Sequence, residues 1–323
     1  MFLNIDESRP YLSGFTAFYE SEIAHWMADQ IARHRKAKRQ ALIVAGAGLA
    51  GLALLIWLNF AADIHIEELS VELAFALPIL IVVGVVFLAL WPLRKLHGEV
   101  KAFLLGKVCG FLDLKYSEVP AGFPFDNFND IGLLPGHHRR KLEDNISGSH
   151  DEVAFSLCEA RLERRQRDSK GRTTYVEVYH GILFQLTFPK RFAGRTLVTR
   201  DGGSIGNFFR GIGKQERVTL EDPRFEKLFE VYSSDQVEAR YLLTPTFMER
   251  MMALAATFGE KSVEMAFVDD HLLVSIRVRK DQFEGGSMFQ AMDDTKRIET
   301  LIEELCKIYD LIDTLQLNIK TNV

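Results

Sequence analysis

The sequence predicts an α+β fold in which a two-helix transmembrane hairpin is followed by a cytoplasmic domain of antiparallel sheet with packed helices. Two uninterrupted apolar runs, 41–62 and 73–93, predict the hairpin, because each reaches the roughly 20 residues that a helix needs to cross a hydrocarbon core about 30 Å thick. In 151–323, period-two alternation of apolar residues predicts strands, and separate stretches of helical periodicity predict helices. Strands joined in hairpins and separate helices favour an α+β fold over a βαβ fold.

The average composition conceals two unlike parts of the chain. The 323 residues are 47% hydrophobic and 26% charged, with a net charge of −5, and these values exclude disordered and fibrous chains. The mean hydropathy of +0.00 combines the two apolar runs with a strongly charged remainder. Three cysteines are too few for a disulfide framework, so we expect reduced, packed thiols at Cys109, Cys158 and Cys306.

The N-terminal segment 1–40 predicts an amphipathic cytoplasmic helix. Its apolar residues recur at helical spacing, with acidic residues between them. Because no Lys or Arg lies between Leu12 and Arg33, we expect this seam to pack on the cytoplasmic domain rather than to bind lipid by itself. The seam consists of Leu12, Phe15, Tyr19, Ile23, Trp26 and Ile31.

The charges that flank the apolar runs predict the orientation of the hairpin. Basic residues gather before the first run and after the second, whereas the connecting loop is acidic and contains no Lys or Arg. By the positive-inside rule, the N- and C-termini are therefore cytoplasmic and the loop is outside. A cleaved signal peptide fits the first run poorly, because the run is too long and about 40 residues precede it. The flanking basic residues are Arg33, Arg35, Lys36, Lys38, Arg39, Arg94 and Lys95.

The first apolar run contains the glycine pattern of a dinucleotide-binding loop, Gly46, Gly48 and Gly51 in a G-x-G-x-x-G spacing. The helix of such a motif needs a solvated face, and the residues that follow are almost entirely apolar. We therefore interpret the glycines as small residues that let membrane helices pack closely. The same pattern would allow self-association through Ala47 and Gly51, so a homo-oligomer stays open.

The remainder divides into a linker helix and loop, 94–150, and the α+β domain, 151–323. The linker helix covers 94–114, and Pro and Gly residues then predict a loop. The domain begins with a strand from residue 153, a polar turn at 168–171 and a second strand at 176–188. Further strands are predicted at 195–199, 239–243, 263–268 and 272–278, and helices after Pro245 and over 288–316.

The order of these parts, together with several short sequence segments, resembles a bacterial family of uncharacterised membrane proteins, domain of unknown function 3137 (DUF3137). The resemblance covers about 40–317, and it combines the two-span hairpin with five segments of the chain that follows. It implies a bacterial membrane-anchored protein and transfers no activity, so with the charge pattern it predicts the bacterial inner (cytoplasmic) membrane. The segments are 143–148 (EDNISG), 179–183 (YHGIL), 192–196 (FAGRT), 225–235 (FEKLFEVYSSD) and 239–244 (ARYLLT).

One serine stands in a pattern that hydrolases use. Ser204 lies in a G-x-S-x-G sequence after a predicted strand, as in a nucleophile elbow. The following residues are too rich in glycine for the helix that an elbow requires, and His271 is the one histidine downstream, so we interpret the segment as a loop. In this loop the pair Phe208 and Phe209 is a candidate contact with a membrane or a partner, with burial under the sheet as the alternative.

Metal-binding patterns are weak, and we expect neither a metal nor a cofactor. His137 and His138 are adjacent and so cannot share a helix face as ligand pairs do. The acidic clusters at 143–145, 269–270 and 293–294 fit loops, turns and helix starts without an ion.

A cluster of basic residues at the predicted hairpin is the most functional-looking feature. Near an inner leaflet, each basic side chain would contribute about 1 kcal/mol of attraction to anionic lipid. We expect a lipid or protein partner here, and a solvated hairpin tip is the alternative. Nucleic acid is excluded because aromatic residues do not interleave with the arginines. The cluster consists of Arg161, Arg164, Arg165, Arg167, Lys170 and Arg172.

Together these features predict a membrane-anchored cytoplasmic binding or scaffolding module linked to the bacterial envelope, in a chain that shows no assembled catalytic motif. The alternative is a membrane-tethered hydrolase that uses Ser204 or an acidic cluster.

Overall fold

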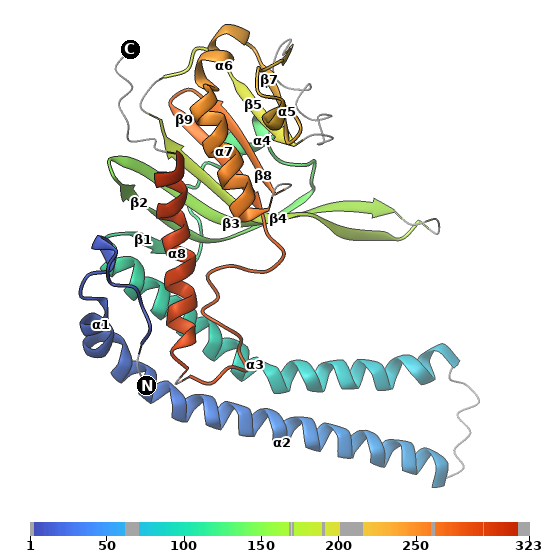
Figure 1. Ribbon diagram of the computed structural model, residues 1–323. Coiled ribbons are helices and arrows are strands. Elements are labelled where there is room, and N and C mark those ends of the chain that lie inside the picture. The colour runs from blue at the N-terminus through green and yellow to red at the C-terminus, as the bar shows by residue number, and fades with distance from the viewer. Residues whose placement is uncertain are drawn as a thin grey trace. The chain divides into compact units, whose positions relative to one another are not determined.

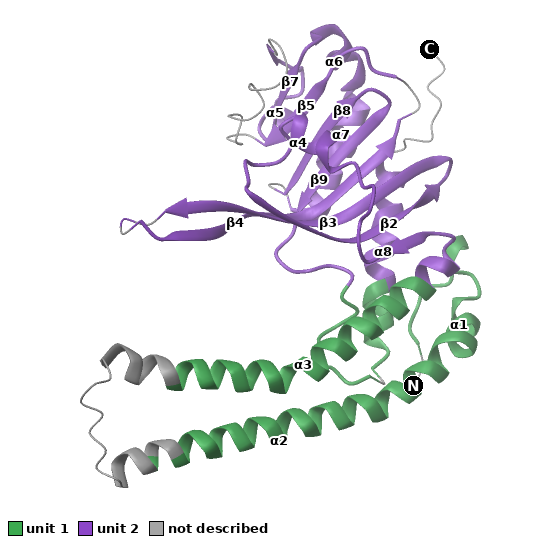
Figure 2. Cartoon of the chain, turned by 180° about the vertical axis from the view of Figure 1, so that it is seen from behind, with its two compact units in different colours: residues 1–107, 284–301 green, residues 108–283, 302–323 purple. Residues whose placement is uncertain are grey.

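The computed structural model describes residues 3–61, 71–167, 169, 171–188, 191–200, 216–259, 262–292 and 294–315. The chain divides into two compact units (Figure 2). Unit 1 comprises residues 1–107 and 284–301, and unit 2 comprises residues 108–283 and 302–323.

Unit 1 is built on two long helices, α2 (His25–Ala61) and α3 (Val71–Phe111), which ends in unit 2. A 3₁₀ turn (η1, Pro10–Leu12), the short helix α1 (Phe15–Phe18) and a π-helical turn (η2, Tyr19–Ala24) precede α2. The three glycines of the G-x-G-x-x-G pattern lie inside α2, which confirms that they form a helix rather than a phosphate-binding loop.

The helices α2 and α3 touch along one narrow stripe of each. Gly48 faces Val85, and a Cβ atom at Gly48 would clash with the side chain of Val85. Near the start of α2 and the end of α3, the rings of Trp26 and Phe103 stack with centroids 3.8 Å apart. A small residue at the crossing therefore sets how closely the two helices approach.

Unit 2 contains a nine-stranded sheet in the order β1-β2-β3-β4-β9-β8-β5-β7-β6 (Figure 1), and each neighbouring pair is antiparallel. The mixed helix and antiparallel sheet confirm the predicted α+β class. The strands are β1 (Lys115–Ser117), β2 (Arg139–His150), β3 (Val153–Arg167), β4 (Thr173–Thr187), β5 (Thr196–Arg200), β6 (Glu216–Val218), β7 (Phe229–Ser233), β8 (Val263–Val268) and β9 (His271–Arg277). The helices are α4 (Phe125–Asp130), α5 (Pro223–Glu226), α6 (Gln236–Leu242), α7 (Pro245–Phe258) and α8 (Lys296–Leu315), the last shared with unit 1.

Both faces of the sheet are covered. On one face α4 and its flanking loops pack their apolar side chains against Leu162, Leu183 and Leu273. On the other, Phe267 of β8 contacts the ring of Phe247 from α7 at 5.7 Å between centroids. Because both faces are covered, β8 and β9 are buried along almost their whole length and lack the alternation of a half-exposed strand.

Three predicted boundaries are wrong. The predicted loop up to residue 150 contains the strand β2, which pairs with β3. Segment 239–243 is a helix, because Asp235 caps α6 by accepting hydrogen bonds from the backbone N–H groups of Val237 and Glu238 at 2.9 and 3.0 Å. The sequence of 239–243 is apolar enough for either structure, and the cap decides.

The last helix begins at Lys296 and not at residue 288, because Arg297 holds the preceding segment in a different shape. Its buried guanidinium donates to the carbonyl oxygens of Gly285, Ser287, Gln290 and Ala291 at 2.7 to 3.0 Å. Carbonyls that bind an arginine in this way cannot all accept helical hydrogen bonds. The three cysteines are buried thiols, as expected, and burial raises the pKa of the Cys109 thiol to about 12.

Candidate functional site

The first candidate surface is the apolar flank of α2 and α3. Two helices in the described part of the chain are long and apolar enough to cross a membrane, Pro10–Leu54 and Pro78–Phe111. Only 11% and 17% of their most apolar stretches are buried. Leu42, Leu80 and Val83 are 75%, 72% and 62% exposed, whereas the core helix of a soluble protein buries such residues.

The second candidate surface is the outer part of the β3–β4 hairpin, which projects from the sheet (Figure 1). β2 pairs with β3 only as far as Glu163, and β9 pairs with β4 only from Gly181 onward. Residues 164–167 and 173–176 therefore pair only with each other, and we name them the basic ribbon. A ribbon of two strands without covering helices leaves both faces open to solvent.

Three of the six residues of the predicted basic cluster lie on this ribbon. Arg164, Arg165, Arg167 and Arg172 are exposed, and Lys170 lies outside the described residues. Sequence reasoning missed Arg139 of β2, whose guanidinium lies 3.4 Å from the ring centroid of Tyr175 in a cation–π contact. The ribbon thus combines positive charge with an aromatic ring that is 37% exposed.

Arg161, also a member of the cluster, has carboxylate partners in the body of the sheet. Its guanidinium contacts Glu177 at 3.4 Å and also forms an ion pair with Asp281. Register explains the position, since Arg161 faces His180 across β3 and β4 in the body of the sheet. We therefore assign Arg161 to the network around Glu159 and not to the ribbon.

That network places a histidine between two carboxylates. His180 Nε2 lies 2.7 Å from Glu159 Oε1 and 3.2 Å from Asp281 Oδ1. The other carboxylate oxygen of Glu159 accepts the backbone N–H of Gln282 at 2.9 Å. Burial raises the pKa of Glu159, against the hydrogen bond from His180, which lowers it.

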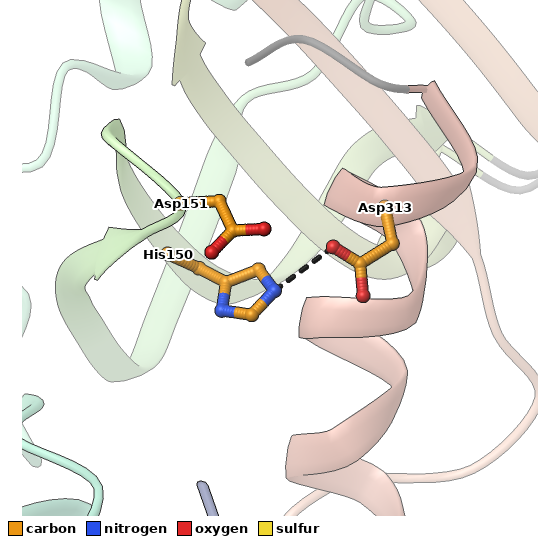
Figure 3. Close-up of side chains that lie close together, drawn as sticks. All are labelled: His150, Asp151 and Asp313. Atoms are coloured by element: carbon orange, nitrogen blue, oxygen red, sulfur yellow. Dashed lines mark hydrogen bonds and ion pairs between the residues drawn. The ribbon is translucent and has the colours of Figure 1, made fainter. Parts of the chain in front are cut away.

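A second histidine–carboxylate group lies at the end of the β2–β3 hairpin and on α8, both in unit 2 (Figure 3). His150 Nε2 lies 2.9 Å from Asp313 Oδ1, and Asp151 lies beside the same histidine. The ring of His150 also stacks on Tyr309, with centroids 4.2 Å apart.

Either group has the donor types that bind a divalent cation, one histidine nitrogen and two carboxylate oxygens. In the Glu159 group, however, Arg161 and the Gln282 N–H already satisfy the carboxylates, which favours a structural role. Sequence reasoning found neither group, because His150 and Asp313 are separated by 163 positions and no local motif joins them.

The remaining predicted site residues fall outside the described part of the chain. Ser204, Phe208 and Phe209 all lie in 201–215, so the structure gives no geometry for a hydrolase or for a membrane contact there. Of the predicted acidic clusters, 269–270 forms the turn of the β8–β9 hairpin, where Asp269 has a positive φ of 52°.

These features define an α+β protein with a pair of long apolar helices and a projecting basic ribbon. The family model described as protein of unknown function (DUF3137) matches residues 177–317, which confirms the resemblance to that family. No curated protein matches the chain. A solved structure, the mycobacterial trehalose monomycolate transport factor A (TtfA), is similar over 68% of this chain and 96% of its own, at 12% identity with a TM-score of 0.36. At that TM-score the likeness is distant.

Proposed function

We propose that this chain is a membrane-anchored binding module of the bacterial inner membrane. In this proposal α2 and α3 cross the bilayer as a hairpin, both termini are cytoplasmic, and the α+β unit binds anionic lipid headgroups through the basic ribbon. The observation that carries it is the exposure of large apolar side chains along both helices, of which Leu80 at 72% is one.

Free energy supports a lipid environment for this flank. A large apolar side chain that stays in water forgoes about 1.5–3 kcal/mol of burial, and α2 and α3 together expose more than ten such side chains. A bilayer removes this cost, because it supplies apolar surroundings to every side of the pair. Exposed Trp57 and Trp91 lie toward the ends of the two apolar runs, where membrane proteins place tryptophan at the interface.

Charge supports the orientation and the role of the ribbon. The basic flanks at the start of the first run and the end of the second favour cytoplasmic ends by the positive-inside rule. On the ribbon, Arg165 and Arg167 lie on the same face as Tyr175, since Arg165 pairs with Tyr175 and the period of a strand is two. Arginine next to an exposed aromatic ring suits a headgroup surface, where phosphate meets the edge of the apolar layer.

Reporter fusions test the anchor. A fusion after residue 95 should read cytoplasmic and a fusion within 63–72 periplasmic, and the chain should stay in the membrane pellet after alkaline carbonate extraction. Release by carbonate would overturn the anchor, and reversed reporters would overturn the orientation.

Hydrogen exchange tests the ribbon. In nanodiscs that contain phosphatidylglycerol, amides of 164–176 should exchange more slowly than in phosphatidylcholine nanodiscs, and R164A/R165A/R167A should abolish the difference. The matched control R191A/R195A/K227A removes three exposed charges elsewhere on unit 2 and should keep it. Equal exchange in the two lipids would overturn the lipid role, and slowing only by an added protein would assign the ribbon to a protein partner instead.

A further inference from the structure

A crevice lies between α2 and α3 in unit 1, at the cytoplasmic ends of the two apolar runs. It has a volume of about 330 Å³. Its lining side chains repeat at one-turn spacing on each helix, so each helix presents one face to the crevice. The polar lining consists of Arg33, Lys36 and Gln40 from α2 and Lys95 and Glu99 from α3.

The lining carries three basic residues and one acidic residue, an excess of positive charge. Arg33 forms an ion pair with Glu99 at 2.8 Å, and its guanidinium also donates a hydrogen bond to the side-chain oxygen of Gln30 at 2.7 Å. Lys36 and Lys95 are exposed and have no ion-pair partner among the described residues. Two lysines that face one crevice repel each other, and a bound anion between them would remove the repulsion.

The position of the crevice along the hairpin indicates which anion it meets. At about 1.5 Å of rise per residue, Lys36 lies about 8 Å from the first apolar run at residue 41, and Lys95 about 3 Å beyond residue 93. The polar headgroup layer on each side of a bilayer is about 5–8 Å thick. Both ammonium groups therefore fall at the depth of the lipid phosphates.

We propose that this crevice binds the phosphate headgroup of an anionic phospholipid from the inner leaflet. The lysines act as point charges on the phosphate, and Gln40 offers an amide N–H to the headgroup. Arg33, held by Glu99, forms one wall. The proposal rests on the proposed membrane hairpin, since only a bilayer brings a lipid phosphate to this depth. Inorganic phosphate offers the same charged group from solution, so the experiment must separate the two sources.

Native mass spectrometry of the full chain in a non-ionic detergent tests the site by titration with phosphatidylglycerol. One saturable lipid should bind the natural chain, and K36A/K95A should weaken it about 25-fold, since each lysine near an anionic headgroup contributes about a factor of five. The control R35A/R94A removes two exposed charges one residue away on each helix, neither of which lines the crevice, and should weaken the affinity clearly less than K36A/K95A. K36Q/K95Q, which keeps the length of the side chains, should behave as K36A/K95A if the effect is one of charge.

Each other outcome overturns the proposal. Equal weakening by the two double variants would indicate diffuse surface charge, and equal binding of phosphatidylcholine would remove the selection for an anionic lipid. Displacement of the lipid by millimolar inorganic phosphate would assign the crevice to a free anion. Carbonate extraction of the membranes, before the chain is solubilised, separates the two hypotheses: a chain that stays in the membrane but fails these titrations refutes the lipid site alone, and a chain that is released refutes the anchor.

Discussion

The apolar helices α2 and α3 and the hairpin of β8 and β9 contain the same kinds of residue, yet they differ in burial. Leu80 and Val83 of α3 are 72% and 62% exposed, whereas Leu273 and Val274 of β9 are fully buried. Each strand has a neighbour on both edges and a covered face above and below, while each helix touches its neighbour along one stripe. The hydrophobicity of a side chain favours its burial, but whether the side chain is buried within the protein depends on the elements that pack against it.

The largest effect should come from truncation in the buried region. Phe267→Ala removes a fully buried ring that packs against Phe188, Phe192 and Phe247, and should lower the free energy of unfolding of unit 2 by about 4 kcal/mol. Leu80→Ala removes an exposed side chain and should leave that transition unchanged. Urea unfolding in detergent, followed by near-ultraviolet circular dichroism, measures both. If Phe267→Ala and Leu80→Ala lowered the free energy of unfolding of unit 2 by similar amounts, the contrast between the buried strands and the exposed helices would be refuted.

A charge in the exposed region should have the next largest effect, and only if that region lies in lipid. Val83→Arg places a guanidinium at the middle of the second apolar run and should cost about 3 kcal/mol of membrane insertion. Val119→Arg is the control, because Val119 is 70% exposed on unit 2 and should tolerate the change. The fraction of chain that resists carbonate extraction measures the effect. If Val83→Arg resists carbonate extraction as well as the control variant does, the exposed flank of α3 faces water.

The contact between the two helices sets a smaller effect. Gly48→Leu forces side-chain atoms into Val85 and should destabilise the helix pair by about 1–3 kcal/mol, measured as a lower Tm in detergent. At Gly51 a Cβ meets no atom within 4 Å, so Gly51→Leu should leave the Tm unchanged. A drop at Gly51 instead would show that this face packs against a second copy of the chain.

The smallest effect should be a pH dependence of the stability of unit 2. Because burial raises the pKa of Glu159, the folded state holds this proton more firmly than the unfolded state does. Stability from this group is therefore present at low pH and is lost as the pH rises from about 4.5 through the raised pKa. Glu159→Gln removes this titration, so the difference in unfolding free energy between the natural chain and the variant should change across that window. If the difference in unfolding free energy between the natural chain and Glu159→Gln does not change with pH, the raised pKa of Glu159 is contradicted.

Local signals predicted much of the fold. The long apolar runs, the β3–β4 hairpin and the β8–β9 hairpin were recognisable because their periodicity and turn residues lie within a few positions of one another. β2 was missed because its first half, from Arg139 to Glu143, is charged and resembles a loop. The start of α8 was misplaced because the helical spacing continues through 288–295, and only the carbonyl contacts of Arg297 end it.

The candidate site was less predictable than the fold. The clustered arginines signalled the ribbon, but nothing in the sequence around Arg161 showed that Glu177 and Asp281 would hold it. Asp281 lies 120 positions from Arg161, and the sheet order brings β4 and β9 together. The cation–π contact between Arg139 and Tyr175 likewise depends on the pairing of β2 with β3, which brings these distant residues together.

By itself, the sequence determined the α+β class, the two apolar segments and the sign of the charges beside them, because these depend on composition and on spacing along a single element. Tertiary structure alone decided which arginines stay exposed, which histidines meet carboxylates, and which lysines of α2 and α3 face one crevice. Those properties depend on side chains from distant segments that share a surface only after folding, and local spacing carries no information about such encounters.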